Sequence, residues 1–275
     1  MQPEMIDGAT RLLVIIGDPI AQVRSPLALN RRLASLGHNQ VMLPWHAPAD
    51  AFAPVMTGLM QTRNLDGIVV TYPFKEKALA FADRIAPRAA QVGAANAIRR
   101  EADGRWTADM FDGVGLVQAV ASLGEDVSGR GVKLLGAGGA GSAIAFALAA
   151  SGASELSIYD VDPVRAASLA DKVGKASPAC RTASGGPELG AATLLVNATP
   201  VGLRADDPLP VPLDELTRAT TVIDIVTRQA GTRLLEHARA RGCPHVGGAA
   251  MVEGQLEALL EFFGLAKPSG MERAA

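Results

Sequence analysis

The stretch VKLLGAGGAGSAIAFALAASG, from Val132 to Gly152, predicts a buried strand, a glycine-rich turn and a helix in succession. G-x-G-x-x-G spacing between a strand and a helix is typical of dinucleotide-binding proteins. The first glycine permits a tight turn, the second lets the backbone approach a pyrophosphate, and the third lets the helix pack closely on the strand. Free N–H groups and the helix dipole attract the phosphates. The residues expected to contact the cofactor are Gly136, Gly138, Gly139, Ala140 and Gly141.

A second short apolar segment, which begins at Glu155, ends in an acid that bears on the choice of cofactor. Asp160 follows Gly136 at about the 20-residue distance typical of the carboxylate that binds the adenosine ribose. A carboxylate accepts hydrogen bonds from a free 2′-hydroxyl but repels a 2′-phosphate. The next two residues are Val161 and Asp162, and no cation occurs before Arg165. NAD is therefore the expected cofactor, and NADP is less favoured.

Length and composition favour two domains that act on small molecules. The chain has 275 residues, which is long for one domain and enough for two buried cores. A formal net charge of −2 provides no basic field that would attract nucleic acid or an anionic membrane. We therefore expect a small-molecule substrate and no nucleic-acid or membrane partner, in a monomer or a homodimer.

The cysteine content and the apolar runs bear on compartment. The cysteines are Cys180 and Cys243, which form no disulfide framework and have no closely spaced Cys or His neighbours of the kind that bind metals. The N-terminal residues lack the pattern of a signal peptide, and no apolar run approaches the ~18 residues of a membrane span. We expect a cytoplasmic protein without a metal site.

The N-terminal part of the chain alternates apolar runs and amphipathic segments, which predicts an α/β domain separate from the glycine loop. Apolar runs that are continuous rather than alternating favour a sheet covered on both faces. Ligands bind beyond the carboxyl ends of such strands, where Thr71 and Lys75 follow the third run. The predicted strands are Arg11–Gly17, Gln40–Trp45 and Asp66–Tyr72, and the predicted helices are one that Ser25 caps and one over Pro48–Met60.

Further along, a predicted hairpin leads to Asp112. Asp103 and Gly104 form a strong two-residue turn signal between two strand-like segments. Asp112 opens a helix, and taken alone an aspartate in this place is more often an N-cap than a catalytic group. Elements predicted downstream are helices over Pro163–Val173, Gly231–Arg241 and Ala250–Phe263, and strands over Thr193–Thr199 and Thr221–Val226.

Several segments occur together in a characteristic order: GDPIAQVRSP, GIVVTYPFKE, GAANAI, FDGVG, GAGGAG, LVNATPVG and GQLEALLEFFG. In these segments the chain resembles shikimate and quinate/shikimate dehydrogenases, over nearly its whole length from Leu12 to Gly264. The resemblance implies an N-terminal α/β substrate-binding and catalytic domain (residues 1–112 and 248–275), a Rossmann-type NAD-binding domain (residues 113–247) and a last helix that returns to the substrate domain. It also implies an active site in the cleft between the two domains.

The resemblance assigns roles to individual residues. It implies that Lys75 and Asp112 form the catalytic pair, which would exchange the hydroxyl proton while hydride leaves a secondary alcohol for nicotinamide. Both would also contact the substrate. The other implied substrate-binding residues are Ser25, Thr71, Asn96 and Gln255, and the remaining implied cofactor-binding residues are Asn197, Thr199 and Pro200.

The implied substrate pocket departs from the family pattern at three positions. Val23 stands where the first of two serines is usual, Val69 replaces an asparagine and Thr227 replaces a tyrosine. Each unpaired buried polar group of a substrate costs about 1–3 kcal/mol, so shikimate is expected to be a poor substrate. A paralogue that acts on a different polyol or amino-polyol acid is the alternative enzyme. A nucleotide-binding regulatory module without turnover is the alternative from another class.

Overall fold

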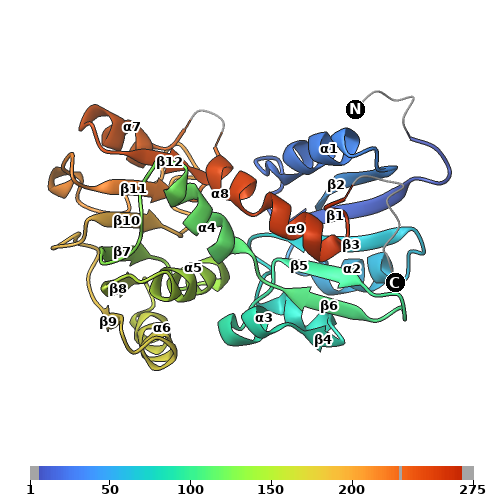
Figure 1. Ribbon diagram of the computed structural model, residues 1–275, viewed down its shortest axis with the longest axis horizontal. Helices are drawn as coiled ribbons and strands as arrows, with labels where there is room; N and C mark the ends of the chain where they lie inside the picture. Colours follow the sequence, from blue (N-terminus) through green and yellow to red (C-terminus); the bar gives the residue numbers. More distant parts are fainter. Residues whose placement is uncertain (1–5, 229–230, 268–275) are drawn as a thin grey trace. The chain divides into compact units, whose positions relative to one another are not determined.

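The structure is a computed structural model that describes residues 6–228 and 231–267. The chain divides into two compact units, each built on a six-stranded sheet (Figure 1). The first unit runs up to Phe111 and resumes at Leu256, and the second unit is Asp112–Gln255. The predicted α/β class is confirmed. No helix of the described ranges is both long and apolar enough to cross a membrane.

The sheet of the first unit has the strand order β2-β1-β3-β5-β6-β4. Strands β2, β1 and β3 are parallel, and β5 and β6 form an antiparallel hairpin beside them. The strands are β1 (Arg11–Gly17), β2 (Gln40–His46), β3 (Leu65–Val70), β4 (Arg84–Ile85), β5 (Ala97–Arg100) and β6 (Trp106–Asp109). The helices before α9 are α1 (Ser25–Ser35), α2 (Phe52–Met60), α3 (Pro87–Val92) and the 3-10 helix η2 (Lys77–Phe81).

The apolar run of β1 explains why this sheet is covered on both faces. Successive side chains of a strand point to opposite faces, yet Leu13, Val14, Ile15 and Ile16 are all buried.

The turn between β5 and β6 differs from the predicted two-residue turn, because Glu101 N–H donates to the carbonyl oxygen of Arg105 across a three-residue loop. Gly104 ends that loop at φ 84°, a left-handed conformation that glycine adopts without strain.

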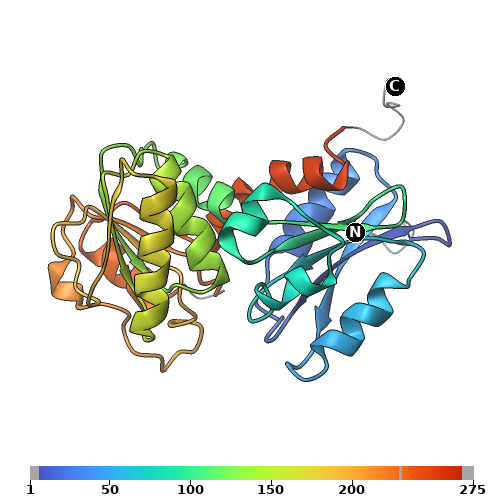
Figure 2. The same cartoon turned by 90° about the horizontal axis from the view of Figure 1, so that it is seen from below.

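The second unit is a parallel sheet with the order β12-β11-β10-β7-β8-β9. Figure 2 shows its helices α5 and α6, in yellow-green and yellow, side by side over one face of this sheet. The strands are β7 (Gly131–Leu135), β8 (Glu155–Tyr159), β9 (Arg181–Ser184), β10 (Leu194–Asn197), β11 (Thr221–Asp224) and β12 (His245–Gly247). The helices are α4 (Asp112–Ala121), α5 (Gly139–Ala150), α6 (Pro163–Ala176), α7 (Arg233–Ala240), α8 (Gly248–Gly254) and the 3-10 helix η3 (Leu213–Glu215).

The C-terminal helix predicted over residues 250–263 is two helices, α8 and α9 (Leu256–Phe263). Helix α8 packs on α4 within the second unit, so residues 248–255 do not group with the first unit as the expected boundary had it. Helix α9 returns to the first unit, where the ring of Phe262 lies 5.2 Å from that of Phe111. A Cβ atom on Gly67 would collide with the ring of Phe263, so β3 and α9 approach closely because this position lacks a side chain.

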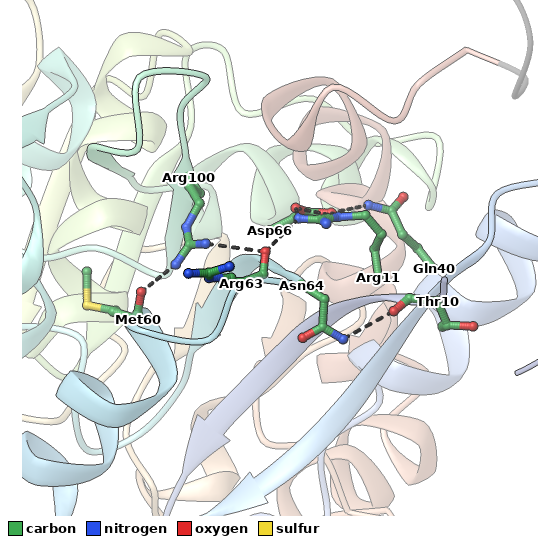
Figure 3. A network of polar contacts seen from close by, with 8 residues as sticks. All are labelled: Thr10, Arg11, Gln40, Met60, Arg63, Asn64, Asp66 and Arg100. Carbon is green, nitrogen blue, oxygen red and sulfur yellow. Dashed lines mark hydrogen bonds and ion pairs between the residues drawn. The ribbon is translucent and has the colours of Figure 1, made fainter. Parts of the chain in front are cut away.

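A polar network ties together the amino ends of β1, β2 and β3 in the first unit, opposite the edge where ligands are expected (Figure 3). Arg11 donates from Nε to both carboxylate oxygens of Asp66 and from Nη2 to the carbonyl oxygen of Arg63. Gln40 Nε2 donates to Oδ2 of Asp66 at 2.7 Å. Arg100 donates to the carbonyl oxygens of Met60 and Arg63, which holds the α2–β3 connection against the hairpin.

Replacing Asp66 with alanine is expected to lower the free energy of unfolding by about 1–2 kcal/mol, because Arg11 and Gln40 lose a shared acceptor. The matched control is Asp171→Ala, which breaks an exposed i,i+4 pair with Lys175 and should cost about 0.5 kcal/mol or less. Urea denaturation of both variants measures the two losses. Equal losses would show that the network of Figure 3 contributes no more to the free energy of unfolding than an ordinary surface pair does.

Candidate functional site

The glycine loop between β7 and α5 is shaped by the absence of side chains. Gly136 has φ 98°, and a Cβ atom there would lie 2.8 Å from the carbonyl oxygen of Ala198. A Cβ atom on Gly141 would collide with the carbonyl oxygen of Gly136. At Gly138, by contrast, the nearest atom to such a Cβ is Nη2 of Arg165, at 3.9 Å. The loop is therefore closed toward its own backbone and open at Gly138, as a phosphate cradle requires.

The start of α5 provides the second feature of the cradle. Gly138 is the N-cap residue, Gly139 is the first helical residue, and no side chain caps this end. The first N–H groups of a helix have no partner within the helix and carry the positive end of its dipole. Ala140, the next residue, is only partly buried, and a helix N-terminus of this kind is suited to bind an anion. These residues fit the diphosphate of a dinucleotide.

Asp160 lies directly beside this loop at the end of β8. Its Oδ2 accepts a hydrogen bond from Ala137 N–H at 2.6 Å, and its Oδ1 accepts one from Asp162 N–H at 2.9 Å. An ionised carboxylate can accept about four hydrogen bonds, so each oxygen keeps capacity for a ligand hydroxyl. Asp162 itself is the N-cap of α6, accepting from Val164 N–H and Arg165 N–H.

Asn197, at the end of β10, organises the following loop rather than facing a ligand. It is fully buried. Its amide nitrogen donates to the carbonyl oxygen of Val201 at 3.1 Å and to Asp224 Oδ1 at 3.0 Å. Its amide oxygen accepts from the N–H and from the hydroxyl of Thr199, at 3.2 and 2.7 Å. All four hydrogen-bonding positions of the amide are thus used, so the direct cofactor contact expected of Asn197 has no polar atom to make it.

Thr199, which is expected to contact the cofactor together with Pro200, lies beside the glycine turn. The Thr199 hydroxyl accepts from Val201 N–H at 3.1 Å, which tightens the loop. A Cβ atom on Gly136 would lie 3.1 Å from the methyl group of Thr199, so this loop lies against the glycine turn. Pro200 is exposed. The ends of β7, β8 and β10 therefore converge at one edge of the sheet.

Sequence reasoning missed Asp224, a fully buried acid at the end of β11. It accepts hydrogen bonds from the Thr232 hydroxyl at 2.6 Å, the Asn197 amide at 3.0 Å and Val226 N–H at 3.1 Å. Burial raises the pKa of Asp224 to about 6, although the three hydrogen bonds oppose that shift. The available signal was an acid at the end of an apolar parallel strand, the same rule that singled out Lys75.

In the first unit the structure brings Thr71, Lys75 and Asn96 together at the carboxyl ends of the parallel strands. Val70 N–H donates to the Asn96 carbonyl oxygen at 2.8 Å, and Ala95 N–H donates to the Lys75 carbonyl oxygen at 2.9 Å. Thr71 N–H donates to the carbonyl oxygen of Ile16 in β1 at 3.0 Å. The Asn96 side chain is buried and its Oδ1 accepts from Phe111 N–H at 2.9 Å. These backbone hydrogen bonds thus place the three residues in neighbouring segments at one edge of the sheet.

The prediction that Ser25 caps α1 is wrong. Arg24 is the N-cap residue, Ser25 is the first helical residue, and the Arg24 side chain makes no capping hydrogen bond. Proline still follows in the first turn, where its missing N–H costs nothing. Because Ser25 is buried yet does not cap the helix, its hydroxyl is not needed for helix initiation. The structural explanation that competed with a ligand-binding role is therefore removed.

Asp112 and Gln255, which the family resemblance assigned to the substrate, both belong to the second unit. Asp112 is the first residue of α4, directly after Phe111, and is 1% exposed. Gln255 is the C-cap of α8 and is also buried. A Cβ atom on Gly115 would lie 3.1 Å from Cβ of Gln255, so Gln255 packs against α4 one turn from Asp112.

The positions that depart from the family pattern lie in apolar or crowded surroundings. Val69 is a buried residue of β3, between β1 and β5 in the sheet. Val23 is partly buried and ends a turn, since its N–H donates to the carbonyl oxygen of Ile20. Thr227 lies against the start of α8, where a Cβ atom on Gly248 would be 2.8 Å from its methyl group.

Among residues 6–228 and 231–267, no group of three or more His, Cys, Asp or Glu side chains could hold a metal ion.

The pKa of Asp224 makes stability depend on pH with a definite sign. The value in the folded protein, about 6, exceeds the ordinary 3.8, so the folded state holds this proton more tightly than the unfolded state. The contribution is complete below pH 3.8 and is lost as the pH rises through about 6. Relative to Asp224→Asn, which does not titrate, the free energy of unfolding of the wild type should fall by up to about 3 kcal/mol between pH 4 and 7.

Urea denaturation of the wild type and of Asp224→Asn at several pH values measures this difference. A difference that stays constant from pH 4 to 7 would contradict the raised pKa.

Comparison with known proteins identifies the family. Residues 15–98 match the family model described as the shikimate dehydrogenase substrate binding domain. A shikimate dehydrogenase (NADP(+)) from Rubrobacter xylanophilus is 38% identical over 256 residues, which cover 92% of this chain and 90% of that protein.

Solved structures resemble the chain over nearly its whole length. The shikimate 5-dehydrogenase of Listeria monocytogenes, in complex with shikimate and NAD, has a TM-score of 0.82 at 28% identity and covers 96% of this chain and 95% of its own. The ligand-free 5-ketofructose reductase of a Gluconobacter strain has a TM-score of 0.78 at 25% identity, with 92% of each chain covered. With this identity over nearly all of its length, the protein belongs to the shikimate dehydrogenase family of nicotinamide-dependent oxidoreductases.

Proposed function

We propose that this protein transfers hydride reversibly between a nicotinamide cofactor and a cyclic hydroxy acid of the shikimate or quinate type. The observation that carries the proposal is the group of Thr71, Lys75 and Asn96 at the strand ends of the first unit. All three residues lie within residues 15–98, the segment that matches the substrate binding domain of the family. The glycine loop with Asp160 in the second unit supplies a dinucleotide site that fits the same reaction.

The proposed chemistry divides between substrate groups and cofactor groups. When bound, the nicotinamide accepts or returns the hydride. Lys75 is proposed to hold the substrate hydroxyl and to exchange its proton, and Asp112 is proposed as the second member of the pair. Ser25, Thr71, Asn96 and Gln255 are proposed to bind the other polar groups of the ring. This is consistent with their burial or their place at the strand ends.

Two valines of the expected substrate pocket bear on which ring the protein binds. Val23 and Val69 are apolar where the family pattern has polar side chains, and a site without those partners disfavours a fully hydroxylated acid. A second candidate is therefore a different polyol or amino-polyol acid. It is favoured by these valines and by the similarity to a protein named 5-ketofructose reductase.

A substrate screen separates these candidates. The purified protein is assayed for reduced-cofactor formation with shikimate, quinate and related cyclic and acyclic polyol acids, with NAD and with NADP. Turnover of a cyclic hydroxy acid above all others supports the first candidate. Turnover of another polyol supports the second. Cofactor binding without turnover of any substrate would instead support a regulatory nucleotide-binding module.

We propose NAD as the preferred cofactor, although relatives such as that of Rubrobacter xylanophilus are named for NADP(+). The proposal rests on this chain's own residues. The Asp160 carboxylate lies beside the glycine loop, and the N-cap carboxylate of Asp162 is two residues away. A 2′-phosphate at this place would meet two acids against one cation, Arg165, whose Nη2 is the atom nearest to a Cβ built on Gly138. The side chain of Val161 between the acids is 88% exposed and carries no charge.

The compartment and assembly are proposed from the composition of the chain. Both cysteines, Cys180 and Cys243, are buried free thiols, which agrees with a reducing cytoplasm. A monomer or a homodimer is proposed for the assembly.

Replacing Lys75 with alanine, or Asp112 with asparagine, is expected to lower kcat by at least ~10²-fold, the usual scale for positioned proton transfer. The dissociation constant for the cofactor should change little in Lys75→Ala, because the glycine loop belongs to the other unit. Steady-state kinetics with the best substrate of the screen, together with cofactor titration, measure both quantities. As a control, Lys77→Ala removes a neighbouring exposed lysine and should turn over normally. Near-normal kcat in both site variants would remove the proposed pair.

Replacing Asp160 with alanine is expected to weaken NAD binding and to reduce discrimination against NADP, since an acceptor for the 2′-hydroxyl and a negative charge are lost together. Asp160→Asn keeps the size of the side chain but removes its charge. Relative to wild type, this variant should therefore favour NADP binding more than NAD binding. Side-by-side titration of both cofactors measures these ratios. A wild type that prefers NADP would overturn the proposed cofactor.

A further inference from the structure

We propose that Asp224 is a positioning residue that fixes the amide of Asn197 and, through it, the loop Thr199–Val201 in the conformation that binds the cofactor. The inference rests on the proposed function and on the cofactor contact that the family resemblance implies for Thr199 and Pro200. It adds a residue that makes no contact with a ligand itself. The observation that carries it is the buried chain of hydrogen bonds that runs from Asp224 through Asn197 to Thr199.

An asparagine amide can be turned in two ways, and Asp224 selects one of them. An ionised carboxylate only accepts hydrogen bonds, so the Asn197 amide nitrogen must face Asp224 Oδ1. The amide oxygen then faces Thr199 and accepts from both its N–H and its hydroxyl. The reverse orientation would set oxygen against carboxylate and place the amide hydrogens against the Thr199 N–H. The Val201 carbonyl oxygen and Thr199 N–H favour the same orientation, and Asp224 anchors the amide in it from the neighbouring strand β11.

Burial makes this selection strong. Asn197 and Asp224 are both fully buried, so water does not readily replace a lost partner. A buried donor or acceptor without a partner costs about 1–3 kcal/mol, which is enough to displace the loop to another conformation. The next link is also tight, because the Thr199 hydroxyl accepts from Val201 N–H and the Thr199 methyl group lies against the glycine turn at Gly136.

The competing explanation is that Asp224 only joins β11 to α7. The Thr232 hydroxyl donates to Asp224 Oδ2 at 2.6 Å and, as the N-cap of α7, accepts from Leu235 N–H. Thr232 therefore provides the matched control, since Thr232→Val removes this junction and leaves the Asp224–Asn197 bond in place. In that variant Asp224 still accepts hydrogen bonds from the Asn197 amide and from Val226 N–H.

The experiment compares Asp224→Ala, Asp224→Asn, Thr232→Val and Asn197→Ala by NADH fluorescence titration and by thermal unfolding. Asp224→Ala and Asn197→Ala are expected to raise the NADH dissociation constant at least ~10-fold, the equivalent of one lost buried hydrogen bond. Thr232→Val is expected to lower the unfolding temperature through loss of the cap, with the NADH dissociation constant within about 3-fold of wild type. NADPH is titrated in parallel in case that cofactor is preferred.

Asp224→Asn tests the chemistry of the proposal. Its amide oxygen can accept from Asn197 and Val226, and its amide nitrogen can donate to the Thr232 hydroxyl, so cofactor affinity should be retained within about 3-fold. The double variant Asn197→Ala with Asp224→Ala should bind NADH no more weakly than either single variant, because both act on one loop.

Two results would overturn the inference: equal cofactor affinities in Asp224→Ala and Thr232→Val, or additive losses in the double variant. Because binding is measured without turnover, a protein that binds NADH but oxidises no substrate would defeat the proposed function and leave this test intact.

Discussion

Burial of parallel, apolar strands on both faces is the constraint on which the rest of this structure depends. Strands such as β1 and β10 have no polar face to offer to water, so their polar side chains lie at the strand ends. In both units the carboxyl ends of the parallel strands lie at one edge. The polar groups of the candidate sites, from Lys75 to Asp160, gather at these edges for that reason.

The last residues of β10 and β11 show how a buried polar group is tolerated. Asn197 and Asp224 are fully buried, and each of their side-chain polar atoms has a partner within the protein. Burial would otherwise cost more than the fold gains from either residue. The raised pKa of Asp224 records the part of this cost that the hydrogen bonds do not offset.

The two units meet the demands of ligand binding by different means. In the second unit, missing side chains create the site, because Gly136 and Gly141 leave space that backbone atoms fill. In the first unit, side chains of neighbouring segments supply the polar groups. A backbone cradle fits every dinucleotide phosphate, whereas a side-chain pocket can change its substrate through substitutions such as Val23 and Val69. Two of the departures from the family pattern, Val23 and Val69, belong to the first unit, whereas the glycine loop belongs to the second.

The sequence by itself determined the α/β class, the two-unit plan, the glycine turn and most strands, because apolar runs, glycine spacing and chain order are local signals. Its errors arose where several segments compete. It predicted Ser25 as the N-cap of α1, whereas Arg24 is the N-cap residue. It also predicted α8 and α9 as one helix, whereas packing of α8 on α4 divides this segment at Gln255. Only the tertiary structure decided that Asn197 turns inward and that Asp224 holds it, since their hydrogen bonds join strands 27 residues apart in the chain. No local pattern records which way a buried amide must face.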